Sequence, residues 1–507
     1  MQFIVRFVTT LFGLIFAVIV ALYLYTKNTD GLKPDIETFI NDQTGLVVRI
    51  NGDLDWQLFP PLSLHIEDVE IDEPHRATHA TTLSLKMDLS AMWEDVNQWQ
   101  VSALNLTDVT ITDDGTHATI NRLDLTDFTF GKPANLYIDA SYTAANAKPI
   151  AGTLEGSVTY TPATDHAPES LSFKQTTLTL DWVNAVCDMH TNQNSRPSHN
   201  SPLTGTDDLL PLAILRRLDV TADCRLSELK VGKETFQAAS LKVTNLSDNL
   251  NIHLEISDFL GGSLTAEADA NFASHPVRWA ILPDINNVDS QRLIDWSNQS
   301  MRWVAPIKLN GKIQMRGNTQ DQLLASISSD LYFDGGRGEI DVTALKAQLD
   351  QLALITGGSK QVASWPDTWA YERFIGTLIT LGTQQKFKVQ LDNLYVDGEG
   401  TYDYAEGQTN LLANATFRKA PQHSPFVVHP LLQDTPLPLR CSGSTDTVRC
   451  RLDQDAAQAL IAGALKRDSD TGLRRKLKDK IDEKVPEAYR DAAHSLLDII
   501  GRSLDRD

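Results

Sequence analysis

The sequence predicts a mainly β protein of the α+β class, with an N-terminal transmembrane helix, a large antiparallel sheet and C-terminal helices. Three observations predict this class. An uncharged apolar run lies near the N-terminus, alternating apolar and polar residues recur from about residue 47, and a helical pattern follows residue 453. Strand–helix–strand units do not recur, which argues against a parallel doubly wound sheet.

The apolar run near the N-terminus extends from Phe7 to Tyr25, close to the ~20 residues that a helix needs to cross a bilayer. Tyr23 and Tyr25 lie where interfacial aromatic residues are expected. A cleaved signal peptide is the alternative, but no small-residue cleavage site follows the run at Thr26. We expect an uncleaved single-pass anchor in residues 1–27, although the flanking charges alone do not fix its orientation.

From about residue 47 the hydrophobic period becomes two, which is typical of strands with one apolar and one solvated face. The clearest apolar alternations are Leu62/Leu64/Ile66, Leu83/Leu85/Met87/Leu89, Leu178/Leu180/Trp182, Leu250/Ile252/Leu254/Ile256, Ile307/Leu309 and Phe387/Val389/Leu391. Turn signals between strands occur at Asp114–Gly115, Gly261–Gly262, Gly335–Gly336 and Asp397–Gly398. Many antiparallel strands joined by turns are therefore predicted.

Helical patterns are few and lie outside these runs. They cover Pro34–Thr44, Leu209–Leu218, Thr343–Ile355 and Asp453–Asp505. The polar segment 191–207 is rich in Asn, Ser and Pro, and we expect an insertion loop between two β regions. Lys466 to Lys484 is basic in an otherwise acidic chain. It is either a solvated helix face or a contact with anionic headgroups or an acidic partner.

Composition limits the partners. The 507 residues carry a net charge of −21, so the chain repels nucleic acid, which we exclude as a partner. The 42% hydrophobic content is enough for a large core and gives no signature of disorder.

Four cysteines suggest two disulfides. Cys441 and Cys450 flank a turn-forming segment, so a hairpin would bring the two thiols together. Cys187 and Cys224 form a possible second pair, and four free buried thiols are the alternative. An even count with one close pair suits an oxidising compartment. Together with the anchor, it favours a bacterial inner-membrane protein with the bulk of the chain in the periplasm.

The motif search predicts neither an enzyme nor a metal or cofactor site. The chain has no P-loop, nucleophile elbow or zinc-protease helix. Gly398-Glu399-Gly400 lacks the third glycine of a dinucleotide fingerprint. Cys187, His190 and Cys224 lack a fourth zinc ligand. We therefore expect no catalytic residues and no cofactor.

Residues 45–74, GLVVRINGDLDWQLFPPLSLHIEDVEIDEP, carry the most specific pattern. The characteristic residues of this pattern are Gly52, Trp56, the Phe59–Pro60 pair and Pro74. The segment closely resembles the opening repeat of the AsmA family. Segments 215–232, 258–272, 335–349, 391–417 and 437–453 resemble later family strands in the same order. The segment 191–207 has no counterpart.

The resemblance implies a periplasmic protein that is anchored in the inner membrane and related to bridge-like lipid-transfer proteins. Such proteins build an elongated, curled sheet with an apolar groove and are implicated in phospholipid transport and outer-membrane biogenesis. Implied partners are phospholipids, the inner membrane and other envelope or outer-membrane assembly proteins. A closed β core in an assembly or regulatory factor for outer-membrane proteins is the alternative, because alternation alone does not distinguish a groove from a core.

With this resemblance, the apolar alternations become candidate groove residues. They are Leu62, Leu64, Ile66, Leu83, Leu85, Leu250, Ile252, Leu254, Ile256, Phe387, Val389 and Leu391. The expected organisation is an anchor at 1–27, a first AsmA-like β region at 28–190, the insertion at 191–207, a second β region at 208–452 and helices at 453–507.

Overall fold

The structure, a computed structural model, describes most of residues 47–453 and a few positions outside this span. Its larger gaps are 58–61, 89–99, 144–148, 194–209, 348–361 and 429–432, with shorter gaps elsewhere. The predicted anchor and nearly all of the predicted helix at 453–505 lie outside the described residues. Of the predicted helix at 34–44, the described residues 34, 37, 38 and 41 are helical. None of the helices in the described part of the chain has the length and apolar character of a membrane span.

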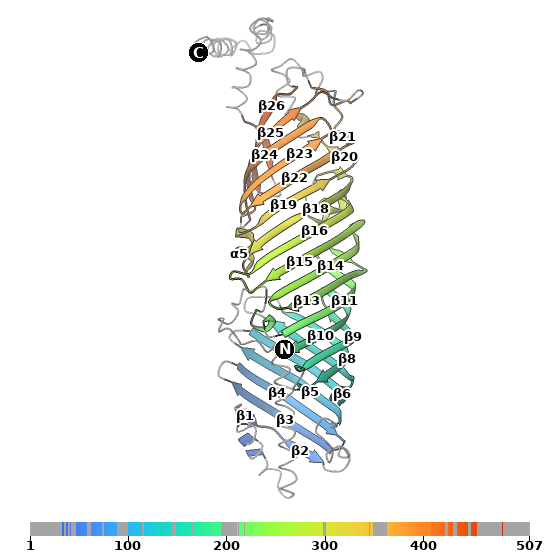
Figure 1. The fold of residues 1–507 in the computed structure, drawn as a ribbon, viewed down its shortest axis with the longest axis vertical. Coiled ribbons are helices and arrows are strands. Elements are labelled where there is room, and N and C mark those ends of the chain that lie inside the picture. The colour runs from blue at the N-terminus through green and yellow to red at the C-terminus, as the bar shows by residue number, and fades with distance from the viewer. Residues whose placement is uncertain are drawn as a thin grey trace. The chain divides into compact units, whose positions relative to one another are not determined.

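The described chain is mainly β, as predicted (Figure 1). It forms two compact units. Unit 1 comprises Met1–Asp258, Thr265–Ala280 and Arg316–Gln320, and unit 2 comprises Phe259–Leu264, Ile281–Met315 and Asp321–Asp507. Twenty-four strands are assigned to one antiparallel sheet, and three short strands form a second sheet within unit 2. Each unit is described by itself below.

Unit 1 contains long strands that pair with their neighbours in chain order. They are β1 (Val47–Ile50), β2 (Leu54–Gln57), β3 (Leu62–Glu73), β4 (Arg76–Met87), β5 (Gln100–Asp113), β6 (Thr116–Thr129), β7 (Ala134–Thr143), β8 (Ile150–Thr161), β9 (Ser170–Leu180), β10 (Val183–Gln193), β11 (Leu218–Val231), β12 (Glu234–Phe236), β13 (Ala239–Leu246), and most of β14 (Asn249–Phe259) and β15 (Gly262–Asn271). A short helix, α3 (Leu212–Leu215), precedes β11. Strands β1 and β2 both pair with β3, and no other pairing of theirs occurs among the described residues.

Unit 2 continues with strands and two short helices. They are β16 (Arg278–Asp289), α4 (Ser290–Trp296), β17 (Trp303–Val304), β18 (Pro306–Arg316), α5 (Gln320–Ala325), β19 (Ser328–Asp334), β20 (Gly338–Asp341), β21 (Thr368–Tyr371), β22 (Phe374–Leu381), β23 (Gln384–Leu391), β24 (Leu394–Asp403), β25 (Gln408–Phe417), β26 (Pro436–Ser444) and β27 (Arg449–Leu452). Strands β17, β20 and β21 form the small second sheet. Within the described residues β27 pairs with β26 alone.

The strand register places apolar side chains in rows that run across neighbouring strands. One row in unit 1 crosses every strand from β3 to β14 except the short β12. It contains Ile66, Leu83, Leu106, Leu123, Ile138, Leu154, Leu178, Ala185, Leu226, Ala239 and Ile256. Since alternate residues of a strand point to opposite faces, such rows define one apolar face of the sheet.

Aspartates interrupt the alternation at defined positions. Asp68, Asp108 and Asp127 adopt positive φ values of 53°, 50° and 58°. In β3 the apolar face holds Ile66 before Asp68 and Val69 after it, and the register with β4 is the same on both sides of Asp68. Each such aspartate therefore shifts the apolar positions of its strand by one residue. Aspartate is among the residues that tolerate this left-handed conformation.

Some predicted elements differ from the observed ones. Asp397–Gly398, predicted as a turn, lies inside β24, where the ring of Phe387 covers the Gly398 Cα. Trp182, predicted in a strand, lies in the turn between β9 and β10 and is 48% exposed.

Two predicted boundaries also move. Residues 191–193 of the predicted insertion are the end of β10, and residues 194–207 of it are not described. The predicted helix at 209–218 is reduced to α3, because the Nδ2 atom of Asn245 donates to the carbonyls of Leu215 and Leu218 and fixes the following turn.

Candidate functional site

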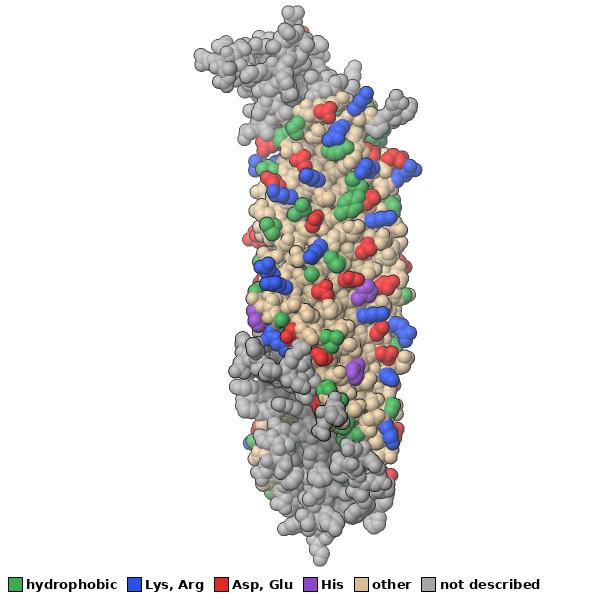
Figure 2. Space-filling view, in the orientation of Figure 1, with side chains coloured by type: hydrophobic (Ala, Val, Ile, Leu, Met, Phe, Trp, Pro, Cys, Tyr) green, Lys and Arg blue, Asp and Glu red, His purple; other side chains and the backbone are tan. Residues whose placement is uncertain are grey.

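The apolar face of the sheet is the candidate site, and the opposite face is polar. One row of the opposite face contains His65, Ser84, Asn105, Asp124 and Tyr137. Asn105 donates to Asp124 at 2.6 Å. Figure 2 shows Lys and Arg interspersed with Asp and Glu among uncharged side chains. The sheet is therefore amphipathic, with a solvated face and an apolar one.

Toward β3, the apolar face of unit 1 is a closed core. The predicted groove residues Leu62, Leu64, Ile66, Leu83 and Leu85 are between 1% and 3% exposed. They pack with apolar residues of β5 and β6. At these strands the face is filled by protein side chains.

At β7 to β9, the apolar face of unit 1 is more open. Ile138, Leu154 and Leu178 are partly exposed, although they continue the row that is buried at β3. Tyr142 and Ile150, paired across β7 and β8, are each 48% exposed. Aliphatic side chains in register remain accessible here, as an apolar ligand would require.

At β13 and β14 the four predicted groove residues differ in burial. Leu250 and Ile256 are buried. Ile252 is partly exposed but packs against the cluster of Leu250 and Phe272. Leu254 is partly exposed and lies opposite Leu241. Leu254 is therefore the member of this group that best represents the accessible face.

In unit 2 two parallel rows form the apolar face, which is partly exposed at most positions from β19 to β24 and buried at Ala413, Ala415 and Leu437. The first contains Leu331, Leu378, Phe387, Gly398, Ala413 and Leu439, and the second contains Phe333, Gly376, Val389, Val396, Ala415 and Leu437. Phe387 and Val389, both predicted groove residues, are partly exposed, whereas Leu391 is buried. The face is most open in the middle of these strands.

Glycines in these rows let aromatic rings lie flat on the sheet. A Cβ at Gly398 would stand 2.5 Å from Cζ of Phe387, and a Cβ at Gly376 would overlap the ring of Phe333. No side chain larger than hydrogen fits under either ring. The glycines therefore set the orientation of two phenyl rings on the apolar floor.

One border of this face is an aromatic wall, formed by Trp365, Trp369, Tyr371, Phe417 and Phe426. Trp369 stacks on Phe426 with ring centroids 4.0 Å apart, and Trp365 contacts both Phe417 and Phe426. The wall packs on Phe374, Leu391 and Leu394, which are in register with Phe417 across β22 to β25.

The indole N–H groups and the tyrosine hydroxyl of the wall are hydrogen-bonded. The Trp365 indole donates to the carbonyl of Val427, and the Trp369 indole donates to Asp392. Trp303 donates to the Tyr371 hydroxyl at 2.6 Å. Burial raises the pKa of Tyr371. The wall is therefore a packed structural border.

The opposite border of the face in unit 2 is polar and uncharged. Here the row contains Ser329, Thr380, Gln385, Gly400, Leu411 and Cys441. Thr380 donates to Oε1 of Gln385 at 2.8 Å, and Nε2 of Gln385 donates to the hydroxyl of Tyr404 at 3.1 Å. We call Ser329, Thr380, Gln385 and Tyr404 the polar rim.

The structure contains both predicted disulfides, Cys187–Cys224 and Cys441–Cys450. Each joins residues directly opposite each other on neighbouring strands. Cys224 pairs onward with Leu241, and Cys441 pairs with Leu411, so both bridges lie on the apolar face. Both cross-link strands that form this face.

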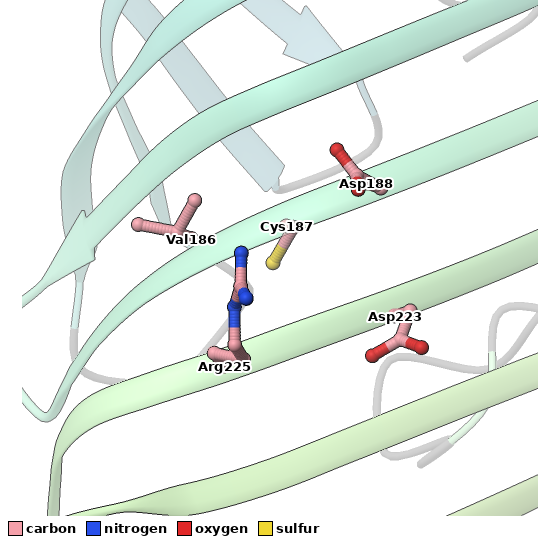
Figure 3. A pocket seen from close by; sticks show the side chains of 5 residues that line it. All are labelled: Val186, Cys187, Asp188, Asp223 and Arg225. Atoms are coloured by element: carbon pink, nitrogen blue, oxygen red, sulfur yellow. The ribbon is translucent and has the colours of Figure 1, made fainter.

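A shallow pocket at β10 and β11 is lined by Val186, Cys187, Asp188, Asp223 and Arg225 (Figure 3). Its carboxylates have structural partners. Asp188 accepts from the backbone amide of Gln175, the bulge residue of β9, at 2.7 Å, and Asp223 lies 3.7 Å from Lys242. Within the described residues, no group of three or more His, Cys, Asp or Glu side chains is arranged to bind a metal.

Sequence reasoning missed the aromatic wall and the polar rim. The wall comes from four separate segments, so periodicity within any one of them does not reveal it. The available signal was the close spacing of Trp365 and Trp369. The rim had no signal, because Thr380 and Gln385 stand at polar-looking ends of otherwise alternating strands.

Comparison with known proteins bears on the N-terminal part of the chain. No curated protein and no solved structure matches the chain. The model of the AsmA family matches residues 4–111, which include β1 to β4 and most of β5. This match contains the Gly52–Pro74 segment that carries the sequence resemblance, and it confirms that resemblance. Residues 4–111 of the chain therefore carry the sequence pattern of the AsmA family.

Proposed function

We propose that the protein holds or passes phospholipid acyl chains on its apolar face and so supports lipid transport to the outer membrane. The observation that carries this proposal is the partial exposure of aliphatic rows in both units, at Leu154 and Leu178 in one and at Leu331 and Leu378 in the other. In a closed sandwich such residues would be buried. The match of residues 4–111 to the AsmA family supports the same proposal.

Energetics favour a sheet face as a lipid carrier. Removing a two-chain lipid from a bilayer exposes many methylene groups, each of which costs about 0.8 kcal/mol in water. Rows of Leu, Phe and Val can replace the bilayer interior without any catalytic group. The proposed function therefore needs no enzyme active site and no cofactor.

We place the protein in the inner membrane, with its β units in the periplasm. The support is the apolar run Phe7–Tyr25 and the two disulfides, which persist in oxidising compartments. Phospholipids are the proposed ligands, and envelope or outer-membrane assembly proteins are proposed partners.

A second candidate function is an assembly factor for outer-membrane proteins that carries no lipid. The closed core at β3 to β6 favours it, because Leu64 and Leu85 are at most 3% exposed there. This alternative does not account for the partly exposed apolar rows elsewhere in the two units.

Photocrosslinking in cells tests the proposal on the full chain. A benzophenone amino acid replaces Leu254 in unit 1 or Leu378 in unit 2, and the control positions are Asn251 and Gln384 on the polar face of β14 and β23. After irradiation the purified protein is analysed by mass spectrometry for phospholipid adducts.

The expected result is phospholipid adducts at Leu254 and Leu378, and few or none at Asn251 and Gln384. Adducts to proteins only, at any of these positions, would favour the assembly factor. Equal lipid labelling of both faces would mean that the apolar face does not select lipid, and the proposal would be wrong.

A further inference from the structure

The apolar face of unit 2 changes in character across its width. The aromatic wall closes one side, two rows of aliphatic and phenyl side chains follow, and the polar rim lies at the other side. A phospholipid has the same order of chemistry along its length, from apolar chains to ester and phosphate oxygens. This inference rests on the proposed function and identifies the residue that contacts the polar part of the lipid.

The polar rim is a hydrogen-bond chain with a defined direction. The Thr380 hydroxyl donates to Oε1 of Gln385, and Nε2 of Gln385 donates to the Tyr404 oxygen. The Tyr404 hydroxyl is therefore an acceptor within the chain, and its own hydrogen remains to be donated to a further acceptor. Successive hydrogen bonds polarise one another, so the last donor of such a chain is strengthened.

The position of Tyr404 suits this role. Gln385 lies on the apolar face, since its neighbours in the row are Thr380 and Gly400, and the Tyr404 hydroxyl reaches it there. The ring of Tyr404 packs edge-on against Tyr402 with centroids 4.8 Å apart, which limits its orientation. Tyr404 is partly exposed, so a ligand can reach the hydroxyl.

We infer that Tyr404 is the hydrogen-bond donor to an ester or phosphate oxygen of a phospholipid whose chains lie on Leu378 and Phe387. Gln385 is a positioning residue that orients the Tyr404 hydroxyl. Ester carbonyl and phosphate oxygens are acceptors, as the direction of the chain requires. The rim residues are uncharged, so the contact recognises the oxygen rather than the net charge of the headgroup.

The test compares two probes on the full-chain protein in amphipol. The first is a phosphatidylglycerol with a fluorescent acyl chain, and the second is its diether analogue, which lacks ester carbonyls. The variants are Tyr404→Phe, Gln385→Leu and the control Tyr332→Phe, whose ring lies on the polar face of β19 and is 39% exposed. Thermal melting verifies that each variant is folded.

Tyr404→Phe should weaken binding of the diester probe by about fivefold to tenfold, the range expected for one hydrogen bond of typical net strength. If Tyr404→Phe weakens binding of the diester probe alone, the acceptor is the ester carbonyl. If it weakens binding of both probes equally, the acceptor is the phosphate. Gln385→Leu should weaken binding in the same direction, and Tyr332→Phe should bind as the wild type does.

Wild-type affinity of folded Tyr404→Phe for both probes would overturn the inference while leaving the proposed function intact. Failure of the wild type to bind either probe would overturn both. A loss of the same size in Tyr332→Phe would also overturn the inference, because the effect would then not depend on the rim.

Discussion

At the scale of single residues, Gly398 and Phe387 show how a sheet obtains a smooth apolar surface. The phenyl ring occupies the space that a side chain at residue 398 would fill, 2.5 Å from an added Cβ. The pairing of glycine with an aromatic residue on the next strand replaces the packing that glycine itself lacks. It also allows β24 to continue through a dipeptide that normally marks a turn.

Gly398→Ala should destabilise unit 2 by about 1–3 kcal/mol, because the new methyl group displaces the Phe387 ring or the strand. The double variant Gly398→Ala/Phe387→Leu should recover part of the loss. Thr401→Val, on the polar face of the same strand, serves as the control. Thermal melting measures all three, and a melting temperature unchanged in Gly398→Ala would contradict this account of the glycine.

For single residues, the sequence predicts the face of the sheet better than it predicts burial. Alternation correctly places Leu64, Leu85 and Val389 on one face, because period two follows directly from backbone geometry. It does not predict which of them is buried, since burial depends on what covers the face. Tyr404 was not predictable at all, because its role depends on a residue of another strand.

At the scale of elements, the connections explain where the disulfides occur. Strands β10 and β11 are joined by a long connection, so their pairing lacks the help of a tight turn. Cys187–Cys224 closes this loop over a sequence separation of 37. Cys441–Cys450 closes a separation of only 9 and attaches the four-residue edge strand β27.

Removing the first bridge should cost more stability than removing the second. Loop-closure entropy gives about 4 kcal/mol for Cys187→Ser/Cys224→Ser and about 3 kcal/mol for Cys441→Ser/Cys450→Ser. The melting temperature of each double variant, measured with and without reductant, checks this order. A larger loss in the Cys441→Ser/Cys450→Ser variant would show that attachment of the edge strand outweighs loop length.

Elements were predicted better than their boundaries. The existence of the strands followed from alternation, and Leu209–Leu218 was recognised as different from its neighbours. Its helix shrank to four residues because Asn245, distant in sequence, binds the carbonyls that would continue it. Tertiary contacts of this kind leave no periodic signal in the segment that they alter.

At the scale of the whole molecule, charge and apolar surface are separated between faces. The net charge of −21 keeps a chain with accessible aliphatic rows soluble, and it does not attract anionic headgroups. Each unit has its own partly exposed rows, so we expect each to hold lipid by itself.

Lipid content should therefore fall in steps when a charge is placed on the apolar face of either unit. Leu254→Asp and Val389→Asp should each remove part of the co-purifying phospholipid, and the double variant should remove more, because an unpaired carboxylate on an apolar surface is costly. Asn251→Asp and Gln384→Asp, on the polar face, should retain it all. Lipid extraction from the folded full-length variants gives the amount of phospholipid per chain. Complete loss of phospholipid in one single variant would contradict separate binding by the two units.

The positive-φ aspartates have a consequence for how the chain tolerates change in length. Asp68, Asp108 and Asp127 act as frame markers, since each decides which residues beyond it point inward. Insertion of one residue beside such an aspartate would turn the rest of its strand inside out, presenting Val69 or Val109 to water and a threonine or glutamate to the interior. A single-residue insertion at these positions is thus equivalent to several simultaneous substitutions, whereas a two-residue insertion would preserve the frame.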